Sequence, residues 1–282
     1  MPNNDDRLPR VALLCHEPDR IDAEGLAAWL AASFDLVGVV ALRTRPGKLL
    51  RNARREIHRS GPLRFLDVLA FRLFYRLWQA RSDAAWIARE LEHLRRRYPA
   101  RLEAVPRLVA TNPNTEEVRG FLQRLRPDLL IARCKFILKP EIFTIPGAGT
   151  FVLHPGICPE YRNAHGCFWA LVNRDLDRVG MTLLRVDAGV DTGPIYLQAT
   201  YPFNEVEESH RVIQYRVVLD NLEAIAAALR SVWNGHAPPI STEGRGSATW
   251  GQPWLTAYLH WKAAARRRQV NAPSDPALSR RL

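Results

Sequence analysis

The residues of this sequence with the clearest capacity for chemistry lie between Thr150 and Gln198. His154 directly follows Thr150–Leu153, a short apolar run that is typical of a buried strand. In an open parallel sheet, ligands bind beyond the carboxyl ends of the strands, and an imidazole there ionises near neutral pH. His154 is therefore placed for acid–base chemistry, although a purely structural hydrogen bond would also explain a histidine at this point.

A loop rich in aspartate and glycine follows, between the strand candidates Met181–Val186 and Ile195–Thr200. This loop, Asp187–Gly193, reads DAGVDTG. Two carboxylates and two glycines permit close approach of the backbone to a ligand, and a turn that uses these residues for its own geometry is the alternative. Together, His154 and Asp191 predict an imidazole that is oriented by a carboxylate at one end of a sheet.

The segments around these residues have the rhythm of an α/β protein. Strand, helix and strand are predicted at Arg10–Cys15, Ile21–Ala32 and Leu36–Leu42, which is a βαβ unit and indicates a parallel sheet. Further strands are expected at Arg107–Ala110 and Pro127–Arg133, and further helices at Thr115–Leu125, Pro140–Ile145 and Glu207–Trp233. After Pro238 the chain shows no clear pattern.

This pattern resembles the folate-dependent formyltransferases, the family of glycinamide ribonucleotide, methionyl-tRNA and sugar N-formyltransferases. Their signature is Asn-x-His-Pro/Gly-Ser/Gly-x-x-Pro-x-Tyr/Trp-Arg-Gly, followed further on by an Asp-Thr-Gly loop. Here HPGICPEYRN stands at 154–163 and DTG at 191–193, while PDLLI at 127–131 and ILKP at 137–140 also match. The resemblance covers roughly residues 10–235, so we predict a flexible N-terminus at 1–9, a formyltransferase-like domain at 10–235 and a C-terminal extension or short tail at 236–282.

The resemblance implies a Rossmann-like parallel-sheet domain that binds 10-formyltetrahydrofolate, and an amine that attacks the formyl carbon. By position, His154 would assist proton transfer and Asp191 would orient and support it. The folate pterin would lie against two segments that flank the histidine. These are predicted to contribute Cys134, Phe136, Ile137, Leu138, Asp187, Ala188, Gly189 and Val190.

The chain departs from the family signature at one position. The family's asparagine, two residues before the histidine, donates a hydrogen bond to the formyl oxygen, but Val152 stands there. Loss of such a donor typically lowers the rate by about a hundredfold or more. Asn163, which replaces the family's glycine, is the predicted substitute donor, and His165 is a second candidate. His154, Cys158, His165 and Cys167 do not have the spacing of a zinc site, so no metal is expected.

Most of the net charge of +11 lies between residues 45 and 101, which hold 15 of the 40 basic and five of the 29 acidic residues. This segment is predicted to be a helical insertion without a strand. Leu63–Trp78 has a broad apolar face, which favours a helix packed on the body of the protein or, alternatively, a helix at 62–78 on an anionic membrane surface. Because the charge is local, nucleic acid is not the expected partner.

Three functions remain open from the sequence. The first is formyl transfer to a small amine, such as an amino sugar or nucleotide sugar; the second is hydrolysis of 10-formyltetrahydrofolate; the third is a non-catalytic binding protein of this fold, which Val152 makes credible. Only residues 236–282 follow the domain, too few for the β-barrel that methionyl-tRNA formyltransferases carry. The first ten residues, MPNNDDRLPR, lack a secretory signal, so a cytoplasmic location is expected, and a homodimer stays open.

Overall fold

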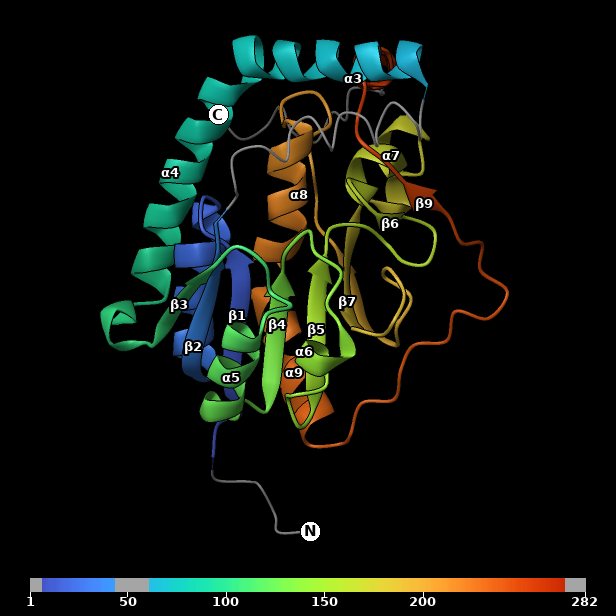
Figure 1. The fold of residues 1–282 in the computed structure, drawn as a ribbon. Coiled ribbons are helices and arrows are strands. Elements are labelled where there is room, and N and C mark those ends of the chain that lie inside the picture. The colour runs from blue at the N-terminus through green and yellow to red at the C-terminus, as the bar shows by residue number, and fades with distance from the viewer. Residues whose placement is uncertain (1–6, 44–60, 272–282) are drawn as a thin grey trace, which may run out of the picture.

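The central element of the computed structural model, which describes residues 7–43 and 61–271, is a mostly parallel β-sheet (Figure 1). In this described part the sheet has seven strands in the order β3-β2-β1-β4-β5-β7-β8. The strands are β1 (Arg10–His16), β2 (Asp35–Leu42), β3 (Arg107–Ala110), β4 (Leu129–Arg133), β5 (Gly149–His154), β7 (Gly180–Arg185) and β8 (Ile195–Thr200). The predicted α/β class is therefore confirmed.

The sheet departs from the predicted parallel arrangement at one edge. The pairs from β3 to β5 are parallel, whereas β7 is antiparallel to both β5 and β8. Parallel neighbours need a long crossover, and the short loop between β7 and β8 closes only an antiparallel pair. As a consequence, the loop that carries Asp191 leaves the sheet at the level of Thr150, whose carbonyl accepts the Val186 N–H at 2.7 Å.

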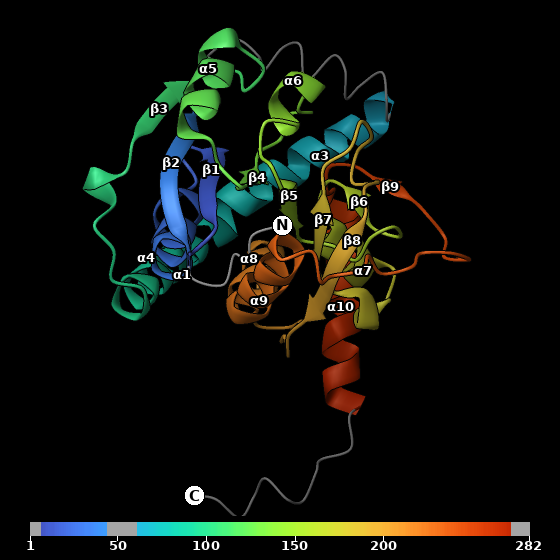
Figure 2. The same cartoon turned by 90° about the horizontal axis from the view of Figure 1, so that it is seen from below.

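Helices cover both faces of the sheet, and Figure 2 shows α5 and α6 on the opposite side from α8 and α9. Alternate residues of β1 supply the two cores: Val11 and Leu13 face one layer, and Ala12 and Leu14 face the other. One layer contains η1 (Ile21–Leu26), α1 (Ala27–Ser33), α8 (His210–Leu219) and α9 (Leu222–Trp233), and the other α5 (Glu116–Leu125) and α6 (Pro140–Phe143).

The prediction of one long helix at Glu207–Trp233 is wrong in one respect, because the structure has two helices there, α8 and α9. The break falls at Asn221, whose backbone is not helical. Its side-chain amide donates to the carbonyls of Val217 at 2.9 Å and Thr200 at 3.1 Å. Asparagine competes in this way with helical hydrogen bonds, so apolar periodicity alone did not reveal the break.

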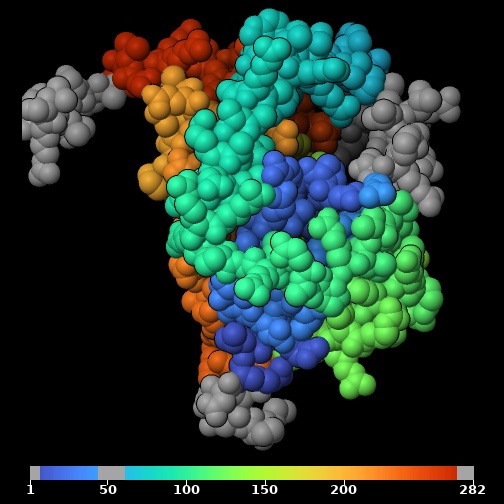
Figure 3. Space-filling view, turned by 90° about the vertical axis from the view of Figure 1, so that its left-hand side faces the viewer, coloured from blue at the N-terminus to red at the C-terminus, as the bar shows by residue number. Residues whose placement is uncertain are grey.

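The basic insertion is helical in its described part, residues 61–101, and contributes no strand there, as predicted; residues 45–60 lie outside the described residues. It consists of α3 (Pro62–Phe74), η2 (Tyr75–Gln79) and α4 (Ala80–Arg97), and the short helix η3 (Leu102–Ala104) follows it. In Figure 1, α3 crosses above the carboxyl ends of the parallel strands, and Figure 3 shows α4 running down one side of the molecule. Within residues 7–43 and 61–271, no helix is both long and apolar enough to cross a bilayer.

The C-terminal extension differs from the patternless tail that the sequence indicates. It forms β9 (Thr249–Trp250), which pairs with β6 (Arg162–Asn163), and the helix α10 (Leu255–Asn271), which packs against α3 and α7 (Gly166–Val172). Small alanines and a buried lysine, Lys262, lie on the inner face of α10, so the apolar period is weak although the helix is packed. Residues 272–282 lie outside the described residues.

At the other end of the chain, Arg7 forms an ion pair with Asp128 at 2.8 Å, which connects the segment before β1 to the residue before β4. The remainder of the N-terminus that is predicted to be flexible, residues 1–6, lies outside the described residues.

Candidate active site

His154 and Asp191 lie together at the carboxyl end of β5. Nδ1 of His154 is 3.5 Å from Oδ2 of Asp191, and the two side chains are 5% and 13% exposed. The predicted proximity is therefore met. The loop that carries Asp191 starts beside Thr150, at the amino end of β5. Asp191 nevertheless lies next to His154, at the carboxyl end of the same strand.

The other ring nitrogen of His154 is occupied by the backbone. Nε2 is 2.7 Å from the carbonyl oxygen of Tyr161. A carbonyl oxygen can only accept, so Nε2 carries the hydrogen. Nδ1 is consequently the nitrogen with a lone pair, and it faces the carboxylate of Asp191.

Asp191 is held by one contact to its carboxylate and by another to the backbone before it. The backbone N–H of Asn163 donates to Oδ2 at 2.8 Å, and the guanidinium of Arg162 donates to the preceding carbonyl, that of Val190, at 3.2 Å. Asp191 has a φ of 52°, in the left-handed region that is unfavourable for most residues. The surrounding hydrogen bonds keep this backbone in place and so direct the carboxylate to the histidine.

Asp187, the other carboxylate of the loop, serves the turn itself. Its Oδ1 accepts the backbone N–H of Gly189 at 2.9 Å and the hydroxyl of Thr192 at 2.7 Å. The alternative of a structural turn thus applies to this aspartate, whereas Asp191 reaches the histidine. Gly193 has no room for a side chain, since an added Cβ would lie 1.9 Å from the carbonyl oxygen of Arg185.

Asn163 does not have the geometry predicted for a substitute donor. Its side-chain amide donates to the carbonyl of Trp250 at 2.6 Å and so joins β6 to β9. Its contribution to the site is the backbone N–H on Asp191. Val152 lies on the same face of β5 as His154 and packs beside Cys158, Leu184 and Ile195.

His165 is also engaged elsewhere. Its Nδ1 is 3.0 Å from Oε1 of Gln214 on α8, and burial together with the charge of Lys135 lowers its pKa to about 4. Both candidates from the Tyr161–His165 loop therefore have other partners, and neither fills the place of the family's asparagine.

The segment predicted to receive the pterin follows β4 and is fixed by residues that the sequence reading missed. Asn114 donates to the carbonyl of Ile137 and accepts from the backbone N–H of Lys139, both at 2.9 Å. His16, at the end of β1, accepts the backbone N–H of Lys135 at 3.1 Å. The apolar side chain of Ile137 is 65% exposed at this edge. The sequence signal that could have indicated His16 is its position directly after the predicted strand Arg10–Cys15, since β1 pairs with β4.

A buried ion pair lies beneath this edge of the sheet. Nε of Arg133 is 3.0 Å from Oδ1 of Asp22, and the same guanidinium donates to the carbonyl of Leu153, the residue before His154. Burial raises the pKa of Asp22 to about 6, and Arg133 opposes that shift. The pair therefore links η1, β4 and the end of β5, next to His154.

The C-terminal extension supports the loop that carries these contacts. The ring of Trp250 stacks on Tyr161 at 5.6 Å and on Trp169 at 5.2 Å between centroids. Arg245 forms an ion pair with Glu160 at 2.7 Å. Residues 245–250 thus hold the 160–163 segment against the body of the protein.

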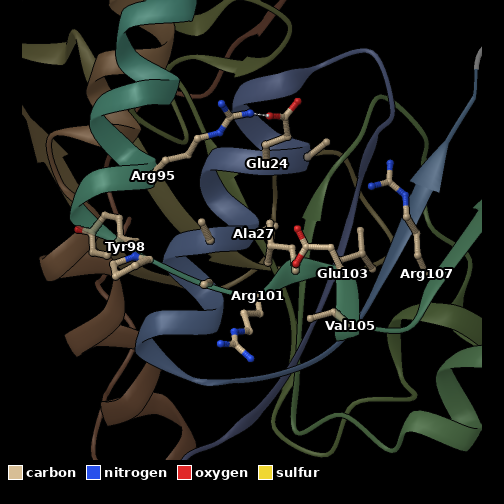
Figure 4. A pocket seen from close by; sticks show the side chains of 14 residues that line it. Glu24, Ala27, Arg95, Tyr98, Arg101, Glu103, Val105 and Arg107 are labelled. Carbon is tan, nitrogen blue, oxygen red and sulfur yellow. Dashed lines mark hydrogen bonds and ion pairs between the residues drawn. The ribbon is translucent and has the colours of Figure 1, made fainter.

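A separate cavity of about 860 Å³ lies between η1, α1, the end of α4 and η3 (Figure 4). Glu24 and Arg95 form an ion pair of 2.6 Å at its rim, and Tyr98 and Arg101 line it. None of its lining residues belongs to the 154–163 or 191–193 motifs. This cavity is therefore distinct from the candidate active site.

Fold and site together define an α/β protein with an acid–base pair at the carboxyl edge of its sheet. The family described as formyl transferase matches residues 86–229, about half of the chain. The chain belongs to the formyl transferase family.

The sequence is similar to those of methionyl-tRNA formyltransferases. A methionyl-tRNA formyltransferase from Xylella fastidiosa (strain M23) is 32% identical over 145 residues, which are 48% of this chain and 47% of that protein. One from Pelotomaculum thermopropionicum is 30% identical over 136 residues, 44% and 43% of the two chains. The chain thus spans about half the length of the curated relatives it matches.

Solved structures agree on the fold. A phosphoribosylglycinamide formyltransferase from Anaplasma phagocytophilum superposes with a TM-score of 0.53 and 15% identity, over 88% of this chain and 100% of that one. A sugar N-formyltransferase from Shewanella sp. gives a TM-score of 0.51 and 13% identity, over 91% and 87%. At these identities the likeness concerns the fold alone.

Proposed function

We propose that this chain transfers a formyl group from 10-formyltetrahydrofolate to the amine of a small-molecule acceptor, an amino sugar or nucleotide sugar. The observation that carries the proposal is the pairing of His154 with Asp191 within the family's matched motifs. Membership of the formyl transferase family supports the reaction class. The name of one structural neighbour, a sugar N-formyltransferase, motivates the choice of acceptor for testing.

The residues at the carboxyl edge fit a flat, partly polar ring. Partly exposed Phe136 and Ile137 offer apolar contact after β4, and the Asp187–Val190 turn offers backbone polar groups. The folate, when bound, supplies the activated formyl carbon. On this proposal the two segments bind and orient it, as the resemblance implies for residues 134–138 and 187–190.

His154 has the role of proton acceptor in this proposal. As an amine attacks a carbonyl carbon, it becomes acidic and must lose a proton. Nδ1 of His154 accepts that proton, and the carboxylate of Asp191 stabilises the resulting imidazolium, while Nε2 remains donated to the Tyr161 carbonyl. The formyl group then leaves the folate as its C–N bond breaks, and the departing folate nitrogen takes up a proton, so that tetrahydrofolate and the N-formyl amine are released. The Asp191–His154 contact holds the ring in one orientation.

Val152 is the specific observation that favours weaker or different chemistry. Valine cannot donate to the oxygen on which negative charge develops, and Asn163 and His165 have other partners. Hydrolysis, with water in place of the amine, and binding without catalysis therefore remain the two alternatives to transfer.

One assay separates the three functions. Purified full-length protein is mixed with 10-formyltetrahydrofolate and a panel of amino sugars, nucleotide amino sugars and simple amines, and release of tetrahydrofolate is followed. We expect release that requires an amine and yields its N-formyl product. Release without any amine would instead indicate a hydrolase, and folate binding without release would indicate a binding protein. His154→Asn is the inactive control, and His236→Asn, at an exposed position, is the matched active control.

A further inference from the structure

One side of α3 and η2 carries a row of exposed leucines. Their side chains are between 40% and 83% exposed, and their spacing of three or four residues places them along one side of the helix. We call this row the leucine face. It consists of Leu63, Leu66, Leu69, Leu73 and Leu77.

Two polar residues of the same helix, Arg64 and Asp67, contact the C-terminal extension. Asp67 accepts the backbone N–H of Thr256 at 3.1 Å, and the guanidinium of Arg64 lies 3.8 Å from the ring centroid of Trp254. Val68 and Phe71 are buried beside them. The helix is therefore apolar on two sides, of which one is buried against the protein and the other, the leucine face, is exposed.

The charge around the leucine face is of one sign. Arg72, Arg76 and Arg81 are exposed on or beside it, and the only acidic residue in 61–82 is Asp67, which faces inward. Trp78, at the end of η2, is 68% exposed.

We propose that the leucine face docks on an anionic lipid surface. Leucines and a tryptophan on an outward face, with arginines beside them, match the chemistry of a helix that lies in a membrane interface. In Figures 1 and 3 the helix α3 lies at the outer boundary of the molecule. Exposed apolar patches on protein surfaces mark interaction sites, including those with membranes.

Charge complementarity favours lipid over a second copy of the chain. A symmetric contact between two leucine faces would bring Arg72 and Arg76 of both copies together without an acidic partner on either helix, and like charges at an interface oppose association. Anionic headgroups, in contrast, pair with these arginines. The contact is peripheral, since no described helix is able to span the bilayer.

The proposal is tested by vesicle flotation of the full chain. Vesicles of phosphatidylcholine alone are compared with vesicles that also contain phosphatidylglycerol, at low and at high salt. We expect partitioning onto the anionic vesicles to be at least about tenfold stronger than onto the neutral ones, and to weaken with salt. The triple variant Leu66→Gln, Leu69→Gln, Leu73→Gln should lose at least about tenfold of this binding.

Matched controls keep the result specific. Leu259→Gln and Val109→Gln change exposed apolar residues outside the leucine face and should bind like the unchanged protein. Circular dichroism and thermal unfolding establish that every variant is folded. Equal binding by the triple variant, or no binding to anionic vesicles, would overturn the proposal. A dimer in sedimentation velocity that the triple variant converts to monomers would also overturn it, in favour of a second copy as the occupant. None of these readouts depends on formyl transfer.

Discussion

The backbone N–H of Asn163 lies 2.8 Å from Oδ2 of Asp191, the same carboxylate oxygen that faces Nδ1 of His154. One oxygen thus joins the β6 segment to the histidine at the end of β5. Because the donor at position 163 is a backbone group, this contact does not depend on the side chain there. The orientation of Asp191 is therefore a property of the loop conformation.

Removal of either member of the acid–base pair should abolish most of the proposed activity. We expect His154→Asn and Asp191→Asn to lower kcat for formyl transfer by about a hundredfold to ten-thousandfold, since proton transfer by a positioned side chain contributes on that scale. Steady-state kinetics measure the change, and folate affinity should change much less. If both variants keep more than half of the activity of His236→Asn, the assigned roles are wrong.

Asn163 is expected to matter for stability more than for catalysis. Asn163→Ala removes the hydrogen bond to Trp250 and places alanine at a φ of 74°, so it should lower the free energy of unfolding by about 1–3 kcal/mol. Asn163→Gly removes the same amide but accepts the backbone conformation, so its loss should be smaller. Urea denaturation of the pair measures the difference. A folded Asn163→Gly protein with activity reduced about a hundredfold would instead restore the side chain as the catalytic donor.

Restoring the missing asparagine provides a direct test of the Val152 substitution. Val152→Asn should leave formyl transfer equal or raise it, because the new amide would donate toward the formyl oxygen. The comparison is kcat in the presence of a saturating amine. The matched variant Val152→Thr, of similar size to valine, controls for a change in packing against Leu184 and Ile195. A fall in kcat with Val152→Asn but not with Val152→Thr would show that the site is not arranged for this donor.

Acid should destabilise the fold through two histidines under α3. Burial and the neighbouring charges of Lys135, Arg211 and Arg72 lower the pKa of His165 to about 4, and burial with His165, Arg211 and Lys262 lowers that of His210 well below its usual value. In the unfolded chain a histidine titrates near 6.5, so between about pH 4 and 6.5 the unfolded state binds more protons. Stability should therefore fall as the pH drops below about 6.5.

The check is the melting temperature at pH 7.5 and pH 5. His210→Gln, which cannot ionise, should show a smaller decrease than the unchanged protein, whereas His236→Gln, at an exposed position, should show the same decrease. Identical decreases in all three proteins would assign the acid sensitivity to other groups.

Lys262 on α10 should be important for the attachment of the C-terminal helix. Its ammonium donates to the carbonyls of Glu205 at 2.6 Å, Val206 at 3.2 Å and Glu208 at 2.7 Å. Lys262→Met keeps the length of the side chain but leaves these carbonyls without their donor, so we expect a loss of about 2–4 kcal/mol in unfolding free energy. Arg267→Met, at an exposed position of the same helix, is the matched control, and urea denaturation is the measurement.

The sheet and the acid–base pair were predictable because they depend on strong local signals. Short apolar runs mark β1, β2, β4 and β5, and His154 follows directly from the end of such a run. The 154–163 and 191–193 motifs then predict the proximity of His154 and Asp191, which the structure contains at 3.5 Å. To predict these features it is enough to know the local sequence and the order of the strands.

The supporting contacts were not predictable, because they join residues that are distant in sequence. Arg133 with Asp22, Asn114 with Ile137, and Trp250 with Tyr161 each connect separate elements. The packing of α10 was also not predicted. Its buried face includes Ala257, Ala265 and Lys262, which do not give the sequence a clear apolar periodicity. The observed contact of the Asn163 side chain differs from the predicted one for the same reason, because its partner, Trp250, lies on β9.

The pairing of β6 with β9 has a consequence for the order in which the protein is assembled. Every strand of the central sheet has been synthesised by Thr200, but Thr249 and Trp250, which complete the support of the Asn163 segment, emerge from the ribosome much later. Domains fold as their segments become available during synthesis. We therefore expect the nascent chain to hold a formed sheet with an unsupported Asp191 loop, and to acquire a competent acid–base pair as one of the final events of folding.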